Sequence, residues 1–407
     1  MLINVRKRLI EIVLLWTLIG YPLLGIYTTV TGIDNRTVSV AVRIVVVLTS
    51  LFLIATAMSD KKFRINSLLA AFFGLYLARL VFDYAYQNND YALVAIQFYL
   101  ASVVFPAIAL ASYAEYILTI QKRVVILLIV SGALFIPAYF YAYRNGLFFT
   151  QGTDDTNVRY ASEFVNAVSL GHFTCIVAIA TFFYTIEYKP RLFERAACGA
   201  ILVGTGVALF LSGSRAGFVG MVVASAVYAI ARPSRLVILI PFALGGLMYL
   251  PEDNYLVRRM TDLLNSNWDT GALERMNVQS TALADFFDSP VIGKHFIDMN
   301  WGPGLYPHNI LVEVLMALGL VGAVPLFLIS GMSMYKALKF RSQLTFYAIL
   351  YFVSFTFLQT SGALWAADSL FVLTSVLLTA SKKFEPRFVA GFQRRPRPIQ
   401  SSSHAPL

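Results

Sequence analysis

Long hydrophobic runs separated by short polar connections make up most of this chain. A run of about 20 apolar residues can cross the roughly 30 Å hydrocarbon core of a bilayer as a helix. Only helices or closed barrels satisfy their backbone groups in lipid. We therefore predict an all-α polytopic membrane protein with about 12 transmembrane helices. The predicted spans are residues 9–31, 38–58, 65–85, 91–118, 124–143, 161–187, 196–212, 216–231, 235–250, 309–335, 343–360 and 365–380.

Composition excludes a soluble globular protein. Hydrophobic residues make up 58% of the chain and charged residues only 13%, too few to cover a soluble surface. The first apolar run follows Arg6-Lys-Arg8 but is longer than the apolar part of a signal peptide, so we expect it to remain as an anchor.

The basic residues predict the orientation. With both termini in the cytoplasm, 22 Lys and Arg fall in cytoplasmic segments and 8 in outer ones. We thus expect Arg6 and Gln393 inside, and Asp154 and Asn267 outside. The net charge of +10 is explained by topology and by affinity for anionic membrane lipids, without a nucleic-acid partner.

Residues 251–308 form one outer segment much longer than the others, and long loops on one face often carry a site. Apolar residues recur at helical spacing at 253–265 and 272–288, which predicts two amphipathic helices on the outer membrane surface. The expected organisation is spans one to nine in 1–250, the periplasmic loop in 251–308, spans ten to twelve in 309–381 and a disordered cytoplasmic tail in 382–407.

Three short motifs carry candidate chemistry. Arg215 lies in Ser212-Gly-Ser-Arg-Ala-Gly217, in the outer turn between spans seven and eight. Arg275 precedes Ser289-Pro-Val-Ile-Gly293. His308 stands in Pro307-His-Asn309 where span ten begins, with Gly319 and Gly322 further on. Each also has a plainer interpretation: an arginine at the lipid headgroups, an arginine paired with a nearby acid, and an interfacial histidine.

Together the motifs resemble those of the O-antigen ligase and polymerase family, membrane enzymes that move glycans from a polyprenyl diphosphate carrier. The resemblance implies that Arg215 and Arg275 bind the donor diphosphate, for which a guanidinium offers a planar fork. His308 would be the general base, because the pKa of histidine suits proton transfer near neutral pH. Possible additional residues are Arg43, Arg258, Arg259 and Asn309, of which Asn309 is expected to cap or orient.

The resemblance further implies an O-antigen ligase, similar to type-C glycosyltransferases in having its site at the outer face. The donor would be an undecaprenyl diphosphate-linked glycan and the acceptor a sugar hydroxyl of lipid A-core oligosaccharide. We expect inverting transfer at the bacterial inner membrane, with no metal and no cofactor, because arginines supply the positive charge. The first alternative is a polymerase that uses the same donor. The second is a transporter of lipid-linked sugars, which would place its charged residues at the membrane midplane.

Several charged residues lie inside the predicted spans. Charges inside spans are costly in lipid, which makes them functional hypotheses; they are Arg43, Arg79, Glu115, Glu163 and Glu313. Arg79 is expected to pair with an acid in the bundle, and His172 to be structural. Two cysteines, Cys175 and Cys198, cannot form a disulfide framework or a metal cluster.

Overall fold

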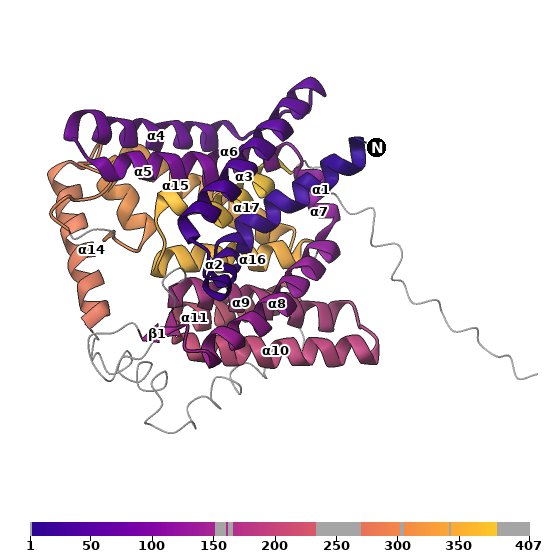
Figure 1. Ribbon diagram of the computed structural model, residues 1–407. Helices are drawn as coiled ribbons and strands as arrows, with labels where there is room; N and C mark the ends of the chain where they lie inside the picture. Colours follow the sequence, from indigo (N-terminus) through magenta and orange to yellow (C-terminus); the bar gives the residue numbers. More distant parts are fainter. Residues whose placement is uncertain are drawn as a thin grey trace, which may run out of the picture.

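The computed structural model describes residues 2–150, 160–161, 166–232, 270–301, 305–341 and 343–380. Within these ranges the chain is a bundle of helices (Figure 1). The predicted all-α class is confirmed. The helices of the first half are α1 (Leu2–Leu15), η1 (Trp16–Gly20), α2 (Tyr21–Thr31), α3 (Asn35–Ser59), α4 (Ser67–Gln87), α5 (Asp90–Phe98), η2 (Tyr99–Val104), α6 (Phe105–Ala111), α7 (Ala114–Thr119) and α8 (Gln121–Arg144).

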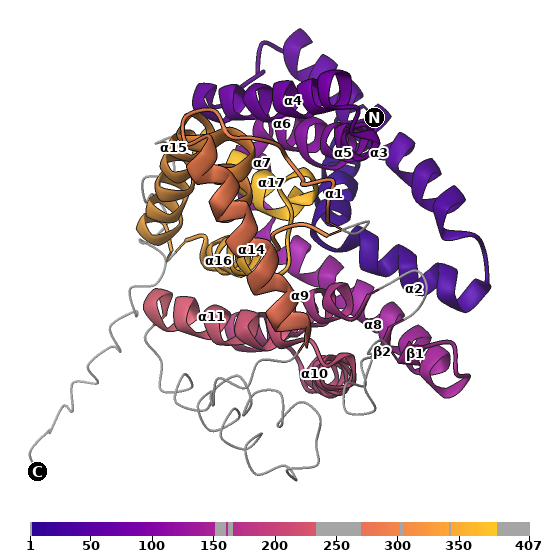
Figure 2. The ribbon, with the colours of Figure 1, turned by 90° about the vertical axis from the view of Figure 1, so that its left-hand side faces the viewer.

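The second half begins with the two-residue strands β1 (Phe149–Thr150) and β2 (Tyr160–Ala161), which pair antiparallel. The helices that follow are α9 (Ala167–Glu187), α10 (Leu192–Ser212), α11 (Arg215–Ala231), α14 (Thr270–Asp288), α15 (Ile310–Lys339), α16 (Thr345–Thr360), η4 (Leu364–Ala366) and α17 (Asp368–Thr379). Figure 2 shows α9, α16 and α17 inside the bundle, with α3, α4 and α10 toward its rim.

Eight helical segments are long and apolar enough to cross a membrane, and the chain is a polytopic membrane protein. They are Asn4–Thr31, Asn35–Ser59, Ser67–Gln87, Asp90–Ala111, Gln121–Arg144, Ala167–Glu187, Leu192–Ser212 and Ile310–Lys339. Three shorter apolar helices, α11, α16 and α17, correspond to predicted spans eight, eleven and twelve. The ninth predicted span, 235–250, lies outside the described residues.

Asparagine and aspartate set where several of these helices begin. Asp34, Asn66, Asn166 and Asn309 each accept backbone N–H groups of the first turn of α3, α4, α9 and α15. These N–H groups have no partner inside the helix, so a side-chain acceptor satisfies them. The capping role expected for Asn309 is confirmed.

Two boundaries differ most from the prediction. The fourth span ends at Ala111 instead of 118, and Glu115 follows in α7, exposed and 3.6 Å from Arg64. The assignment of Glu115 to a span was therefore wrong, because an exposed ion pair marks the end of the bundle and not its interior. The sixth span begins at Ala167 instead of 161, and Glu163 lies outside the described residues.

Helix α14 lies across one end of the bundle, close to perpendicular to α4 and α10 (Figures 1 and 2). We call this the α14 end. The helix matches the second predicted amphipathic segment, while the first, 253–265, lies outside the described residues. Its face toward α15 buries Val278, Ala282 and Asp285, whereas Leu273 and Met276 are exposed. A helix with an exposed apolar face across the ends of spans fits the surface of a membrane.

The orientation can be tested with single cysteines. We expect Asn300→Cys, at the α14 end, to react in whole cells with a membrane-impermeant maleimide, and Lys62→Cys, between α3 and α4, to react only after lysis. Both positions are exposed, and the native Cys175 and Cys198 are buried and give little background. The reverse labelling pattern would place the α14 end in the cytoplasm.

Candidate functional site: a polar cavity beneath α14

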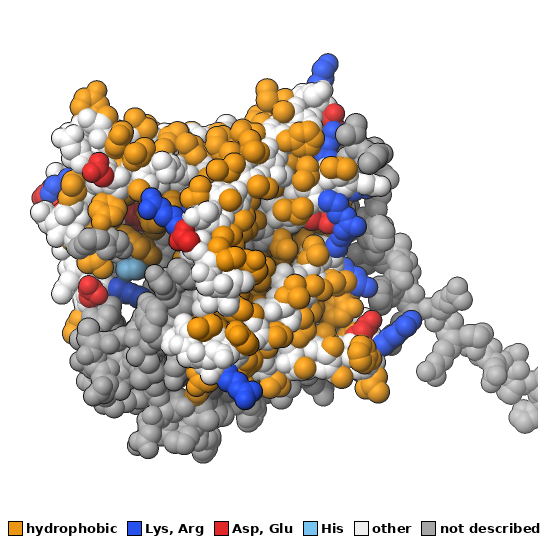
Figure 3. Space-filling view, viewed as in Figure 1, with side chains coloured by type: hydrophobic (Ala, Val, Ile, Leu, Met, Phe, Trp, Pro, Cys, Tyr) orange, Lys and Arg blue, Asp and Glu red, His pale blue; other side chains and the backbone are white. Residues whose placement is uncertain are grey.

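A cavity of about 950 Å³ opens near the α14 end of the bundle. Figure 3 shows a hollow there, with a histidine side chain visible inside it. The charged and histidine residues of its lining are Asp34, Arg36, Arg43, His172, Arg275, His308 and Asp368. Its aromatic residues include Trp16, Tyr21, Phe98, Tyr306 and Trp365. A polar, partly aromatic cavity of this size within an apolar bundle is the natural site for a ligand.

His308 enters the cavity from the loop before α15. Its φ is +55°, a conformation uncommon for residues with a side chain, and Asn309 then caps the helix. Strained backbone of this kind clusters at functional sites. The ring of Tyr306 packs against the imidazole at 4.0 Å between centroids. Nδ1 of His308 is buried and has no hydrogen-bond partner among the residues the structure describes.

The surroundings keep the His308 imidazole neutral. Burial first, and then the nearby Arg275 guanidinium, lower the pKa of His308 from 6.5 to about 4, against the opposing effect of a hydrogen bond with the Ser361 backbone. A neutral imidazole at pH 7 has a lone pair available to accept a proton. The side chain thus has the protonation state that a general base needs.

Arg275 reaches the same cavity from α14. Its Nη1 donates a hydrogen bond to the carbonyl oxygen of Thr360 at 3.2 Å. This carbonyl lies at the carboxyl end of α16, where the helix dipole favours a cation. One turn further along α14, Nε2 of Gln279 donates to the carbonyl of Pro307 at 3.0 Å. Helix α14 therefore holds both a cavity arginine and the loop that carries His308.

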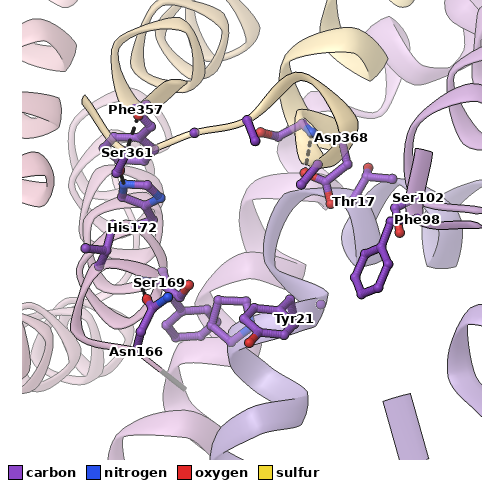
Figure 4. A pocket seen from close by; sticks show the side chains of 18 of the residues that line it. Thr17, Tyr21, Phe98, Ser102, Asn166, Ser169, His172, Phe357, Ser361 and Asp368 are labelled. Atoms are coloured by element: carbon purple, nitrogen blue, oxygen red, sulfur yellow. Dashed lines mark hydrogen bonds between the residues drawn. The ribbon is translucent and has the colours of Figure 1, made fainter. Parts of the chain in front are cut away.

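The end of α16 joins the parts of the site. The hydroxyl of Tyr306 donates to the Ser361 carbonyl at 3.2 Å, and burial raises the pKa of Tyr306 to about 12. From α9, Nε2 of His172 lies 3.3 Å from the Ser361 hydroxyl, and its ring stacks on Phe357 (Figure 4). His172 thus has structural contacts, as predicted, but it also lines the cavity.

Glu313, one of the charges predicted inside a span, anchors the wall behind the cavity. It is buried in α15, accepts a hydrogen bond from the Tyr76 hydroxyl at 2.9 Å and another from the backbone N–H of Leu364 at 2.8 Å. These bonds join α4, α15 and η4, and they satisfy a carboxyl group that would be costly in an apolar interior. Arg79 likewise pairs with an acid in the bundle, Asp83 of the same helix, at 3.0 Å.

A break in α15 locks this helix to the connection that follows α14. Gly319 has φ +57° and ψ −151°, which interrupts the helical hydrogen bonds. The N–H groups of Leu320 and Val321 instead donate to the carbonyls of Pro290 and Val291, at 2.9 and 3.0 Å. A Cβ at Gly319 would lie 2.5 Å from the carbonyl carbon of Val291, so only glycine fits.

We expect Gly319→Ala to lower the free energy of unfolding by about 1–3 kcal/mol or more, because alanine must adopt this glycine conformation and clash with Val291. Gly331→Ala in the same helix is the matched control, since nothing lies within 4 Å of its added Cβ. Thermal unfolding of the purified proteins in detergent provides the measurement. Equal melting temperatures for the two variants would contradict a lock at Gly319.

A second pair of charges lies elsewhere in the cavity lining. The guanidinium of Arg43, in α3, lies 3.8 Å from the centre of the Phe98 ring. Asp368, the first residue of α17, interacts electrostatically with Arg43. The prediction that Arg43 contributes to the site is consistent with its position in the cavity lining. The three sequence motifs contain none of Asp368, Arg36 and Tyr306 as candidate site residues, although an acid at the start of an apolar run was a signal for Asp368.

The other predicted arginines are placed differently. Arg215 is the first residue of α11 and is partly exposed; as far as the described residues define the cavity, it does not line it. The turn before Arg215 is tightly packed on α9. A Cβ at Gly171, the residue before His172, would lie 2.3 Å from the Ser214 side chain. Arg258 and Arg259 lie outside the described residues.

One group of side chains has the spacing of metal ligands. Oxygen and nitrogen atoms of Asp285, His295 and Asp298 lie within 4.8 Å of one another. However, the ammonium of Lys294 already contacts Asp285 at 2.7 Å and Asp288 at 2.9 Å, and these carboxylates raise the pKa of Lys294. Within the described residues this cluster is separate from the cavity lining, and it ties α14 to its following loop.

Comparison with known proteins supports the resemblance. Residues 199–327, 129 of the 407 in the chain, match the model of the O-antigen ligase family. The matched segment contains Arg215, Arg275 and His308, and the matching family is the one that the three motifs resemble. It supports a membrane transferase of ligase or polymerase type. No curated protein and no solved structure matches this chain significantly.

Proposed function

We propose that this protein is an O-antigen ligase, which transfers a glycan from undecaprenyl diphosphate to a sugar hydroxyl of lipid A-core oligosaccharide. The α14 end would face the periplasm and both termini the cytoplasm of a bacterial inner membrane. One observation carries the proposal: within the segment that matches the family, Arg275 and the neutral His308 line one cavity.

In the proposed reaction, the acceptor oxygen attacks the anomeric carbon while the bond from that carbon to the phosphate oxygen breaks. The electron pair of this bond leaves with the diphosphate. The Arg275 guanidinium stabilises the charge that grows on the leaving group. Arg215 is assigned to the donor side from the family motif, whereas Arg43, in the lining of the same cavity, lies against Phe98 and interacts with Asp368 and is not assigned to the diphosphate.

His308 accepts the acceptor proton in this reaction. Its unpartnered Nδ1 is the atom we assign to proton transfer, since a buried nitrogen without a partner is satisfied by a substrate hydroxyl. Attack from the face opposite the diphosphate inverts the anomeric centre. We propose that no metal is needed, because the guanidinium groups provide the positive charge that a divalent cation otherwise supplies.

A ligase is favoured over a polymerase by the single long segment at 251–308, since in the family polymerases often have two large outer loops. A transporter of lipid-linked sugars is less well supported. His308 and Arg275 gather at one end of the bundle, whereas transporters bind their substrates near the midplane.

A deletion strain tests the assignment. A ligase mutant retains polymeric glycan on the lipid carrier and loses it from lipopolysaccharide, whereas a polymerase mutant accumulates single repeat units. With purified protein, lipid-linked donor and lipid A-core, transfer is expected to persist in excess EDTA. Loss of transfer in EDTA with recovery by Mg²⁺ would contradict the metal-free reaction.

A further inference from the structure

The cavity has an arm that the proposed chemistry at His308 and Arg275 does not use. Its walls are Thr17, Arg43, Phe98, Ser102, Trp365 and Asp368, which we call the inner arm. Figure 4 shows Thr17, Phe98, Ser102 and Asp368 on the side of the cavity opposite His172 and Ser361. We propose that the inner arm binds the terminal sugar of the acceptor; this rests on the proposed function.

A continuous aromatic wall leads from His308 into the arm. Tyr306 lies 4.0 Å from the His308 ring and 6.4 Å from the Trp365 ring, measured between centroids. Trp365 in turn lies 5.5 Å from Phe98, whose ring faces the Arg43 guanidinium at 3.8 Å. The C–H face of a sugar ring packs on aromatic surfaces of this kind, which bury apolar area and carry a negative π face.

Polar groups in the arm match sugar hydroxyls. Asp368 and Arg43 provide a carboxylate acceptor and a guanidinium donor, while Thr17 and Ser102 bring hydroxyl groups. A few polar groups within an apolar wall are what fixes the orientation of a small ligand. The Thr17 hydroxyl donates to the Leu14 carbonyl at 2.9 Å and Asp368 accepts from the Ser369 N–H at 2.7 Å. Both keep further acceptor lone pairs, which the hydroxyls of a polyhydroxylated ligand can meet and lipid tails cannot.

The backbone around the arm is irregular. Thr17 lies in η1 and Ser102 in η2, both π-helical, and Trp365 lies in the 3-10 helix η4. Interruptions of this type are rare in regular helices and frequent at functional sites. Three irregular helical segments surround one arm, and this supports a binding site there independently of the side-chain chemistry.

The arm selects the acceptor over the donor by its shape. The arm is enclosed on the η1 side, where Thr17 is 2% exposed, Leu18 6% and Ile19 1%. A closed end admits a terminal sugar, whereas the first sugar of a donor glycan is linked both to the diphosphate and to the rest of the chain. A terminal sugar held there reaches His308 along the Tyr306 and Trp365 wall.

The test measures sugar binding without transfer. Of the four tryptophans, Trp16, Trp268 and Trp301 are replaced by phenylalanine, so that Trp365 in the arm is the fluorescent reporter. Deacylated core oligosaccharide is the probe, and we expect a saturable change in emission. Phe98→Ala should weaken binding on the order of tenfold, and a core lacking its terminal sugar should bind equally poorly.

The controls separate this inference from the proposed function. Phe193→Ala makes the same chemical change at a residue of α10 that is 84% exposed, and it should bind as the reporter protein does. His308→Ala should retain binding although transfer is lost; normal transfer by His308→Ala would refute the base while leaving the sugar site standing. If Phe98→Ala proves unstable, Ser102→Leu is the second test: its larger side chain fills the arm and should abolish binding. Full binding by either arm variant, or by the truncated core, would overturn the inference.

Discussion

Replacing His308 by alanine is expected to reduce glycan transfer by about 10²- to 10⁴-fold while the donor still binds. In the proposed reaction the imidazole accepts the acceptor proton and Arg275 binds the diphosphate; Arg275 is held separately, from α14 and by the Thr360 carbonyl. Purified protein with lipid-linked donor and lipid A-core gives the rate, and separate titration with the donor gives its affinity. His295→Ala, which lies outside the cavity lining, is the matched control.

The pH profile distinguishes a base from a structural histidine. Because the pKa of His308 is lowered to about 4, the neutral form predominates above that value. The value of kcat/KM, which reports on the free enzyme, should therefore stay level from pH 8 to about pH 5 and fall only below it. An unperturbed histidine would halve the rate near pH 6.5. Wild-type turnover by His308→Ala would leave this residue as an interfacial histidine.

Much of the fold could be predicted from the sequence because a lipid bilayer restricts the structures that can cross it. Apolar runs of about 20 residues have few alternatives to helices in lipid, and Asn309 at the start of one run predicted its own cap. The apolar stripe of α14 was also visible in the sequence. Its packing was not: Leu273 and Met276 are exposed, while the face with Val278 and Asp285 is buried against the protein.

Only part of the candidate site could be predicted from the sequence, because several of its contacts depend on the backbone and on how helices pack. The motifs pointed to Arg275 and His308. Arg275 is held by the Thr360 carbonyl, and Tyr306, which packs on His308, is held by the Ser361 carbonyl; backbone carbonyls have no side-chain signature. The proximity of Arg43 to Asp368 depends on how α3 and α17 are arranged around the cavity. The π-helical segments η1 and η2 interrupt runs whose hydrophobic pattern continues unchanged, so periodicity could not reveal them.

Substitution of Arg275 by lysine is expected to reduce transfer at least about tenfold even though the charge is kept. An ammonium cannot reproduce the planar fork that binds two phosphate oxygens at once. Nor can it easily bond the Thr360 carbonyl and the diphosphate together. The measurement is kcat and donor KM of purified variants, with Arg64→Lys, an exposed pair member at the other end of the bundle, as the control.

A purely structural Arg275 would behave differently: the lysine variant would melt at a lower temperature, but each folded molecule would transfer at the wild-type rate. That result would reduce Arg275 to a tether between α14 and α16. Arg215→Lys is also expected to impair transfer, because the family motif assigns Arg215 to the diphosphate. If Arg215→Lys alone were spared, the positive charge at the leaving group would come from Arg275, whose side chain lines the cavity.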